Sequence, residues 1–245
     1  MIPKIIHQIW FQGIDKIIEP YKTCFIESIK FINYTKWDHK FWDKETIDDL
    51  IKNNYPQYFD LYNNCPILVQ KIDIARYIIL YHYGGCYMDM DVKIIKDFND
   101  LIDDTDELIV SDTHQKFINN GILFSSKNNN FWIDFLNDLK PKVNRFTFSK
   151  LLCVNFSTGP LNFTNFVKKN INTYKIKILP YKYLEPCETK YHQVITEDAY
   201  VINYYGNSWV DSYFSIFLFI YCYRKLLLIL IIIMIAIIIK IKYSN

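Results

Sequence analysis

The sequence is poor in glycine and lacks any motif that would divide the chain. Only 6 of the 245 residues are glycine, and no internal repeat or linker rich in proline, glycine and serine interrupts residues 1–212. The six cysteines are scattered, without a CxxC pair or a zinc-type Cys/His spacing, which argues against a disulfide scaffold and a structural zinc site. The N-terminus lacks the small-residue cleavage site of a signal peptide. We therefore predict one domain over residues 1–212.

The chain also lacks a strong charge of either sign. Its formal net charge is +2, and four of its 28 basic residues lie beyond residue 212, where no acidic residue occurs. Residues 1–212 therefore hold 24 basic and 26 acidic residues. A domain so close to neutrality is not expected to bind a polyanion, so nucleic acid is excluded as a predicted partner.

The C-terminal stretch has a different composition. Leu226–Ile239 is a run of fourteen uncharged apolar residues with basic residues at both ends. As a helix this run would reach about 21 Å, and snorkelling basic flanks would extend it to roughly 28 Å, close to the ~30 Å hydrocarbon core of a bilayer. We predict that residues 213–245 form a single-pass C-terminal membrane anchor, with a helix in the domain core as the alternative. Because basic residues flank both ends, neither orientation nor compartment is predicted.

Apolar patterns along residues 1–212 alternate between strand and helix periods. Strands are predicted at 2–11, 86–89, 92–95, 108–111, 121–125, 176–179 and 200–204, and helices at 21–32, 44–53, 67–83, 129–139 and 160–170. Strands separated by helices indicate an α/β fold with a largely parallel sheet. Pro66 marks the start of the helix at 67–83, and Gly84-Gly85 marks its end.

The segment from Gln70 to Val92 carries the most informative polar residues. Asp73 and Arg76 are three residues apart in the predicted helix and so project together. The strand after the Gly-Gly turn is predicted to end in Asp89-Met90-Asp91, and in an extended strand the two carboxylates point to the same side. Carboxylates without a neighbouring His or Cys select a hard cation, Mn²⁺ or Mg²⁺, which usually completes its shell with water and phosphate oxygens. The pattern predicts a metal and a diphosphate at the carboxyl edge of the sheet.

The full pattern, DxxRYxxLYxxGGxYxDxD, resembles the DXD-containing sugar transferases of glycosyltransferase family 32. That family includes fungal initiating α-1,6-mannosyltransferases and the enzymes that mannosylate inositol phosphorylceramide, and the catalytic domain of large clostridial glucosylating toxins is a more remote likeness. Three further landmarks occur in the family order, namely the opening segment 2–10, Thr158-Gly159-Pro160 and Ser208-Trp209. The resemblance implies a GT-A-type nucleotide-sugar-binding domain with a mostly parallel central sheet.

The resemblance also implies a donor-binding role for five residues. Trp10 would stack on the nucleotide base, unless it only closes the first strand as a core residue. Asp73 and Arg76 would hold the sugar hydroxyls and the diphosphate, with a surface ion pair as the alternative. Tyr87 would line the donor pocket, and Asn120 would contact the sugar, although strand packing and a plain Asn-Gly turn are the alternatives.

The same resemblance implies how the metal and the closing loop are built. Asp91 would ligate the cation directly, and Asp89 would meet it largely through water or the ribose. Ser208 and Trp209 would come from a loop that folds over the diphosphate and excludes water.

This chain departs from the family pattern ahead of the Ser-Trp pair. Family members commonly have a His there that can serve as a third metal ligand, and this chain has none. Asn203 or Asn207 would replace it through a carbonyl oxygen, and the sequence leaves the choice open.

The resulting hypothesis is a metal-dependent, retaining glycosyltransferase that works by front-face displacement. It would move a hexose, with mannose favoured, from a nucleotide-diphosphate sugar to a hydroxyl of a glycan or a lipid-linked acceptor. Two alternatives remain. The missing His favours a membrane-anchored nucleotide-sugar-binding protein without turnover, and Asp89-Met90-Asp91-Val92 superficially resembles the nucleophilic loop of a HAD-like phosphatase.

Overall fold

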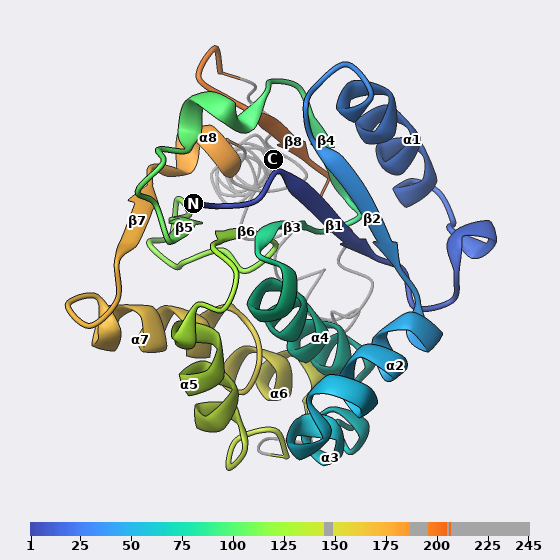
Figure 1. The fold of residues 1–245 in the computed structure, drawn as a ribbon, viewed down its shortest axis with the longest axis vertical. Coiled ribbons are helices and arrows are strands. Elements are labelled where there is room, and N and C mark those ends of the chain that lie inside the picture. The colour runs from blue at the N-terminus through green and yellow to red at the C-terminus, as the bar shows by residue number, and fades with distance from the viewer. Residues whose placement is uncertain (145–148, 187–195, 205, 207–245) are drawn as a thin grey trace, which may run out of the picture. The chain divides into compact units, whose positions relative to one another are not determined.

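The computed structural model describes residues 1–144, 149–186, 196–204 and 206 (Figure 1). Its strands are β1 (Ile5–Ile9), β2 (Asp38–Trp42), β3 (Gly85–Met88), β4 (Val92–Ile94), β5 (Leu108–Ser111), β6 (Ile122–Ser125), β7 (Ile176–Leu179) and β8 (Val201–Asn203). Its α-helices are α1 (Tyr21–Ile32), α2 (Lys44–Asn54), α3 (Phe59–Asn63), α4 (Leu68–Tyr83), α5 (Asn130–Leu139), α6 (Lys150–Phe156), α7 (Pro160–Asn170) and α8 (Tyr181–Leu184).

Six strands form one sheet in the order β2-β1-β3-β6-β5-β7. Strand β6 is antiparallel to both of its neighbours, and the other three strand pairs are parallel. The prediction of an α/β fold with a mostly parallel sheet is therefore confirmed. Strands β4 and β8 pair separately in an antiparallel ribbon.

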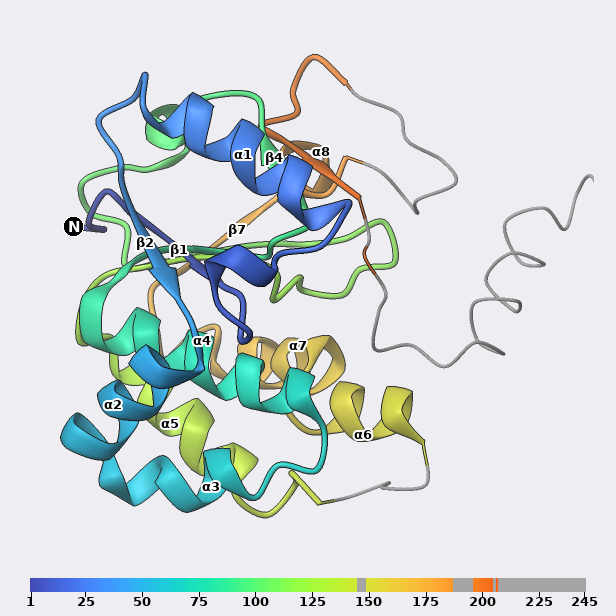
Figure 2. The same cartoon turned by 90° about the vertical axis from the view of Figure 1, so that its right-hand side faces the viewer.

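The sheet is covered on both faces, which explains why its inner strands β3, β5 and β6 are buried on both sides. Helices α2 to α7 lie on one face, and α1, α8 and the β4-β8 ribbon lie on the other (Figure 2). Each face has its own core of buried apolar side chains, one centred on α4 and α5 and the other on β4, β8 and the 98–101 turn. Because α4 lies within the first core, its residues from 73 to 80 are buried all round.

Two kinds of element were missed in the sequence. Strand β2, with the sequence DHKFW, lies at the edge of the sheet, and its polar residues obscure the strand pattern. Helices α3, α6 and α8 have only 5, 7 and 4 residues, too short for a helical period to be recognised.

The prediction that Asp89 and Asp91 lie in a strand is wrong. Strand β3 ends at Met88, and residues 89–91 form a turn, in which the N–H of Val92 donates to the carbonyl of Asp89 over 3.3 Å. The turn is needed because β3 and β4 belong to different sheets.

The part of the chain that the structure describes contains no helix long and apolar enough to cross a membrane. The predicted anchor, residues 213–245, lies outside the described residues, and so do Asn207, Ser208 and Trp209. Residues Met1–Gly206 form one compact unit.

Candidate active site

Two glycines at the end of α4 determine where the DXD turn lies. Gly84 ends the helix with φ 68° and Gly85 continues with φ 91°, a region that favours glycine. A Cβ on Gly84 would lie 2.6 Å from the backbone nitrogen of Lys127, and one on Gly85 would collide with the carbonyl of Ile5. This tight turn places β3 directly beside β1, so β3 carries Asp89 to the carboxyl edge of the sheet.

Arg76 is the centre of the site. Its Nη2 atom lies 2.9 Å from Oδ1 of Asp73 and 3.3 Å from Oδ1 of Asp89, and its Nη1 donates to the carbonyl of Asn120 over 2.6 Å. The guanidinium carbon lies 4.5 Å from the ring centroid of Tyr87. Asp73 and Arg76 are only 2% and 4% exposed, so their reading as a surface ion pair is wrong. The buried pair instead connects α4 to the DXD turn.

Burial and neighbouring charge determine the ionisation of this cluster. Burial raises the pKa of Asp73 to about 6, although Arg76 and a hydrogen bond from Thr158 oppose the rise. Burial also acts against the charged form of Arg76, but Asp89, Tyr87 and Asp73 outweigh it and raise the pKa of the guanidinium. Arg76 is therefore a permanent cation, while the pKa of Asp73 lies above its usual range.

The two carboxylates of the DXD turn are held by different partners. Oδ1 of Asp89 accepts a hydrogen bond of 2.7 Å from the Tyr87 hydroxyl, and the Asp89 side chain is 36% exposed. Oδ2 of Asp91 accepts one of 2.6 Å from the N–H of Gly206. Burial and then the negative charge of Asp89 raise the pKa of Asp91 to about 6. The two carboxylates are therefore within electrostatic reach of each other, despite lying in a turn.

These residues fit a hard divalent cation. The contacts above use Oδ1 of Asp89 and Oδ2 of Asp91, and the second oxygen of Asp89 faces Gly121, where a Cβ would come within 2.6 Å of it. Among the described residues no group of three or more His, Cys, Asp or Glu side chains could hold a metal ion. From the described residues, a cation here would therefore take the two carboxylates of Asp89 and Asp91, with water or a diphosphate among its further ligands.

Asn203, one of the two candidate replacements for the missing His, uses its amide nitrogen in a buried contact. The side-chain amide of Asn203 donates to Oε1 of Glu185 over 3.0 Å, and both residues are buried. Asn203 pairs with Val92 in the β4-β8 ribbon, next to the DXD turn. The second candidate, Asn207, is not among the described residues, so the choice between the two stays open.

Trp10 lies at the same edge of the sheet as the DXD turn. It follows β1 directly and is half-buried, and its Nε1 donates to the carbonyl of Lys16 over 3.0 Å. Its ring lies 5.1 Å from that of Tyr21, whose hydroxyl donates to the carbonyl of Gly206 over 2.6 Å. Since Gly206 also binds Asp91, these contacts connect the predicted base-stacking residue to the predicted metal ligand.

Asn120 contacts both Asp73 and Arg76. Its side-chain amide donates to Oδ1 of Asp73 over 3.4 Å and to the Tyr77 hydroxyl over 3.0 Å. Its predicted contact with the donor sugar stays a prediction.

Two buried residues of the site had no role in the sequence analysis. The Thr158 hydroxyl donates to Oδ2 of Asp73 over 2.6 Å, and the Tyr77 hydroxyl donates to the Thr158 carbonyl over 2.7 Å. Thr158 belongs to a family landmark, and Tyr77 to the DxxRY pattern. Those patterns located both residues without indicating what they contact.

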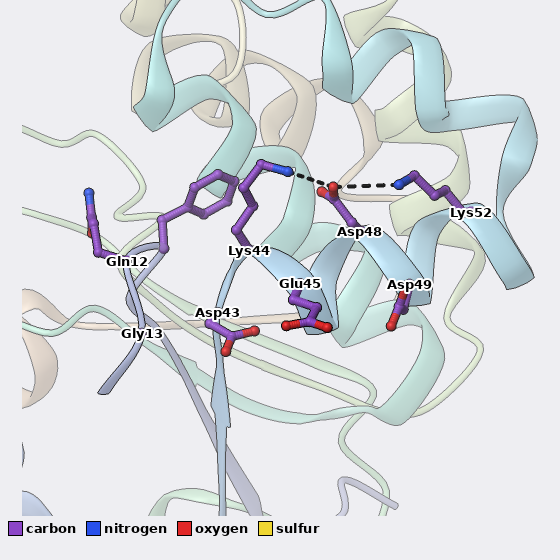
Figure 3. Close-up of a pocket in the computed structure, with 9 residues that line it drawn as sticks. Gln12, Gly13, Asp43, Lys44, Glu45, Asp48, Asp49 and Lys52 are labelled. Atoms are coloured by element: carbon purple, nitrogen blue, oxygen red, sulfur yellow. Dashed lines mark hydrogen bonds and ion pairs between the residues drawn. The ribbon is translucent and has the colours of Figure 1, made fainter. Parts of the chain in front are cut away.

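A separate cavity lies beside the start of α2. It has a volume of about 370 Å³ and is lined by Phe11, Gln12, Gly13, Asp43, Lys44, Glu45, Asp48, Asp49 and Lys52. Figure 3 shows Asp48 between two lysines, with its Oδ2 atom 2.6 Å from Lys44 and 3.7 Å from Lys52. No predicted site residue lines this cavity. Its lining contains four acidic and two basic residues, so it is net negative and unfavourable for an anionic diphosphate.

The chain is similar to known glycosyltransferases in both sequence and structure. A family model described as a glycosyltransferase sugar-binding region containing a DXD motif matches residues 15–108. An uncharacterized glycosyltransferase of Acanthamoeba polyphaga mimivirus is 32% identical over 229 residues, which cover 85% of this chain and 84% of that protein. Inositol phosphoceramide mannosyltransferase 1 of Schizosaccharomyces pombe is 30% identical over 162 residues, which cover 65% of this chain and 49% of that protein.

The chain thus spans about half the length of this fungal relative. Among solved structures, the PaToxG glycosyltransferase aligns with a TM-score of 0.55 and 20% identity over 70% of each chain. This structural likeness supports the fold alone.

Proposed function

The chain belongs to the glycosyltransferases whose sugar-binding region contains a DXD motif, and we propose that it uses a divalent cation, Mn²⁺ or Mg²⁺, to transfer a hexose from a nucleoside diphosphate sugar. Mannose is the favoured sugar, because several relatives are named mannosyltransferases. The observation that carries the proposal is the contact of the buried Arg76 with both the buried Asp73 and the partly exposed Asp89 at the carboxyl edge of the sheet.

The charges of the cluster support the need for a metal. Two carboxylates, those of Asp73 and Asp89, contact the single guanidinium of Arg76, and a third, that of Asp91, is within its electrostatic influence. When all are ionised the cluster is net negative and would repel a diphosphate. A divalent cation held by the DXD carboxylates would neutralise that negative charge, so the diphosphate would no longer be repelled.

The chain's own residues would orient the donor. Arg76 is held from several sides and so presents its charge in a fixed direction, which avoids reorganisation during the reaction. Asp73 would accept hydrogen bonds from the sugar hydroxyls, and Trp10 would stack on the base. A bound cation supplies charge stabilisation at the diphosphate as it leaves. With these carboxylates assigned to the metal and the donor, we propose retention by front-face displacement, as the resemblance implies.

The acceptor is proposed to be a hydroxyl of a glycan or of a membrane lipid. The lipid is favoured by the fungal relatives named for inositol phosphoceramide and by the predicted anchor at residues 213–245. The anchor would keep the active site near a lipid substrate. Flotation of the full chain with liposomes, compared with a chain ending at Gly206, tests it, since only the full chain should float.

Donor hydrolysis tests the proposed function. The purified chain should release mannose or another hexose from GDP-mannose, UDP-glucose or UDP-galactose with Mn²⁺ or Mg²⁺, and EDTA should stop the release. Binding of a nucleotide sugar without hydrolysis or transfer would support the alternative of a binding protein without turnover. Failure to bind any of the three donors would contradict both.

A further inference from the structure

Thr158 lies in a tightly built turn between α6 and α7. It is completely buried, and its hydroxyl donates to Oδ2 of Asp73 over 2.6 Å across 85 residues of sequence. The next residue, Gly159, donates its N–H to the carbonyl of Val154 over 2.8 Å, and a Cβ there would lie 2.9 Å from that oxygen. Pro160 then begins α7 with its φ already restricted. The backbone of this turn therefore holds the Thr158 hydroxyl in one place.

Tyr77, a residue of α4, binds the turn through its hydroxyl. Its hydroxyl donates to the Thr158 carbonyl over 2.7 Å and accepts from the side-chain amide of Asn120 over 3.0 Å. Its ring is fully buried and stacks at 12° on Trp132 and on Phe163, with centroid distances of 5.4 and 6.0 Å. A fully buried ring packed against two other aromatic rings has little freedom, so the hydroxyl is a fixed support.

Both oxygens of the Asp73 carboxylate are thereby held from different directions. Oδ1 contacts Arg76 and Asn120, and Oδ2 contacts Thr158. An ionised carboxylate has about four acceptor positions, and the three contacts leave one of them, on Oδ2, for a hydroxyl of the donor. Without the Thr158 hydroxyl, Oδ2 of Asp73 would be a buried acceptor that has lost this hydrogen bond. The carboxylate could then rotate and bring Oδ2 towards Arg76.

We infer that Thr158, supported by Tyr77, is a positioning residue that holds Asp73 in the orientation required to recognise the donor sugar. This role rests on the proposed function, because it assigns the Asp73 carboxylate to the sugar. A positioning role differs from a purely structural role in the ligand that it affects. Loss of the Thr158 hydroxyl should weaken recognition of the nucleotide sugar much more than recognition of the nucleoside diphosphate.

The test compares Thr158→Val with Thr158→Ser in the full chain. The donor is whichever of GDP-mannose, UDP-glucose and UDP-galactose the wild-type protein hydrolyses fastest with Mn²⁺, and the matched ligand is its nucleoside diphosphate. Thr158→Val should lower kcat/KM for hydrolysis by about 10- to 100-fold, as expected for a lost hydrogen bond to a charged group. The Kd of the nucleoside diphosphate should change by less than about threefold, and Thr158→Ser should restore most of the activity.

A matched control is Thr164→Val. Thr164 is a buried threonine of α7 whose hydroxyl donates to the Pro160 carbonyl over 2.6 Å and accepts from the N–H of Ile118 over 2.8 Å. Its loss should lower stability without changing kcat/KM. Tyr77→Phe keeps the ring and removes the support, so it should lower kcat/KM by about 2- to 10-fold.

Several outcomes would overturn the role. These are wild-type kinetics in folded Thr158→Val, equal losses for the nucleotide sugar and the nucleoside diphosphate, or no rescue by serine. If Thr158→Val does not fold, Tyr77→Phe decides, and wild-type kinetics in that variant would overturn the role as well. A wild-type protein that hydrolyses none of the three donors would instead contradict the proposed function, and this role with it.

Discussion

The backbone N–H of Gly206 donates a hydrogen bond of 2.6 Å to Oδ2 of Asp91, which lies 115 residues earlier in the chain. The contact brings the segment that precedes the Ser-Trp pair directly onto the DXD turn. Under the proposed function, Oδ2 of Asp91 would be held by Gly206 and Oδ1 would meet the cation.

Asp91→Asn tests that division of roles. The amide oxygen can still accept from Gly206, but the loss of charge should weaken Mn²⁺ binding and lower metal-dependent donor hydrolysis by about 100-fold or more. Titration calorimetry with Mn²⁺ and the hydrolysis assay measure the two effects. Asp49→Asn, on α2 and away from the site, is the matched control and should behave as the wild type. Full activity in Asp91→Asn would contradict the assigned metal role.

Arg76→Lys tests the importance of the forked guanidinium. Lysine retains the positive charge but cannot contact Asp73, Asp89 and the Asn120 carbonyl together, so hydrolysis should fall by about 100-fold. Stability should also fall, by about 2 kcal/mol, because buried acceptors lose a charged partner. Urea unfolding and steady-state kinetics measure these changes. A variant with near wild-type kinetics would show that a point charge is enough.

Gly121→Ala tests the space beside Asp89. The new Cβ would lie 2.6 Å from Oδ2 of Asp89 and 3.1 Å from Oδ1 of Asn119, so the carboxylate must move. We expect donor hydrolysis to fall by about 10-fold or more and the KM for Mn²⁺ to rise, because displaced groups at a reacting centre lose much of their effect. Retention of the wild-type KM for Mn²⁺ would show that this oxygen does not face the cation.

His7→Gln tests a pH effect on stability. His7 is fully buried. Its Nδ1 lies 3.2 Å from Nε1 of Trp42, and its Nε2 lies 2.9 Å from the carbonyl oxygen of Gly84. Burial lowers the pKa of His7 to about 4. The unfolded chain binds a proton at this residue near pH 6.5, whereas the folded protein does not until about pH 4. His7 therefore favours folding above pH 6.5, and this stability is lost as the pH falls towards 4.

The contribution of His7 is at most about 3 kcal/mol, and the raised pKa of Asp73 acts in the opposite direction over an overlapping range. The difference in unfolding free energy between the wild type and His7→Gln isolates the contribution of His7, because Asp73 is present in both proteins. That difference should be largest near pH 7.5 and should shrink steadily down to pH 4 in urea titrations. A difference that does not vary with pH would show that His7 is protonated equally in both states.

Local patterns were sufficient to predict most of the fold. The helices at 21–32 and 160–170 were predicted with their observed bounds. Apolar periodicity and the proline at the first position of α7 are patterns of residues that are close in the sequence, so they can be recognised without the fold. The same holds for the Gly-Gly turn after α4. Strand β2 escaped prediction because an edge strand keeps polar side chains, and only its pairing with β1 makes it a strand.

The residue types and spacing of the site could be read from the chain alone, because the chemistry of carboxylates, a guanidinium and a glycine turn is local. The burial of Asp73 and Arg76, the turn at Asp89 and Asp91, and the binding of Thr158 and Gly206 to carboxylates 85 and 115 residues away became apparent only in the folded protein. Contacts between distant segments depend on how helices pack on a sheet. No short-range pattern in the chain encodes that packing.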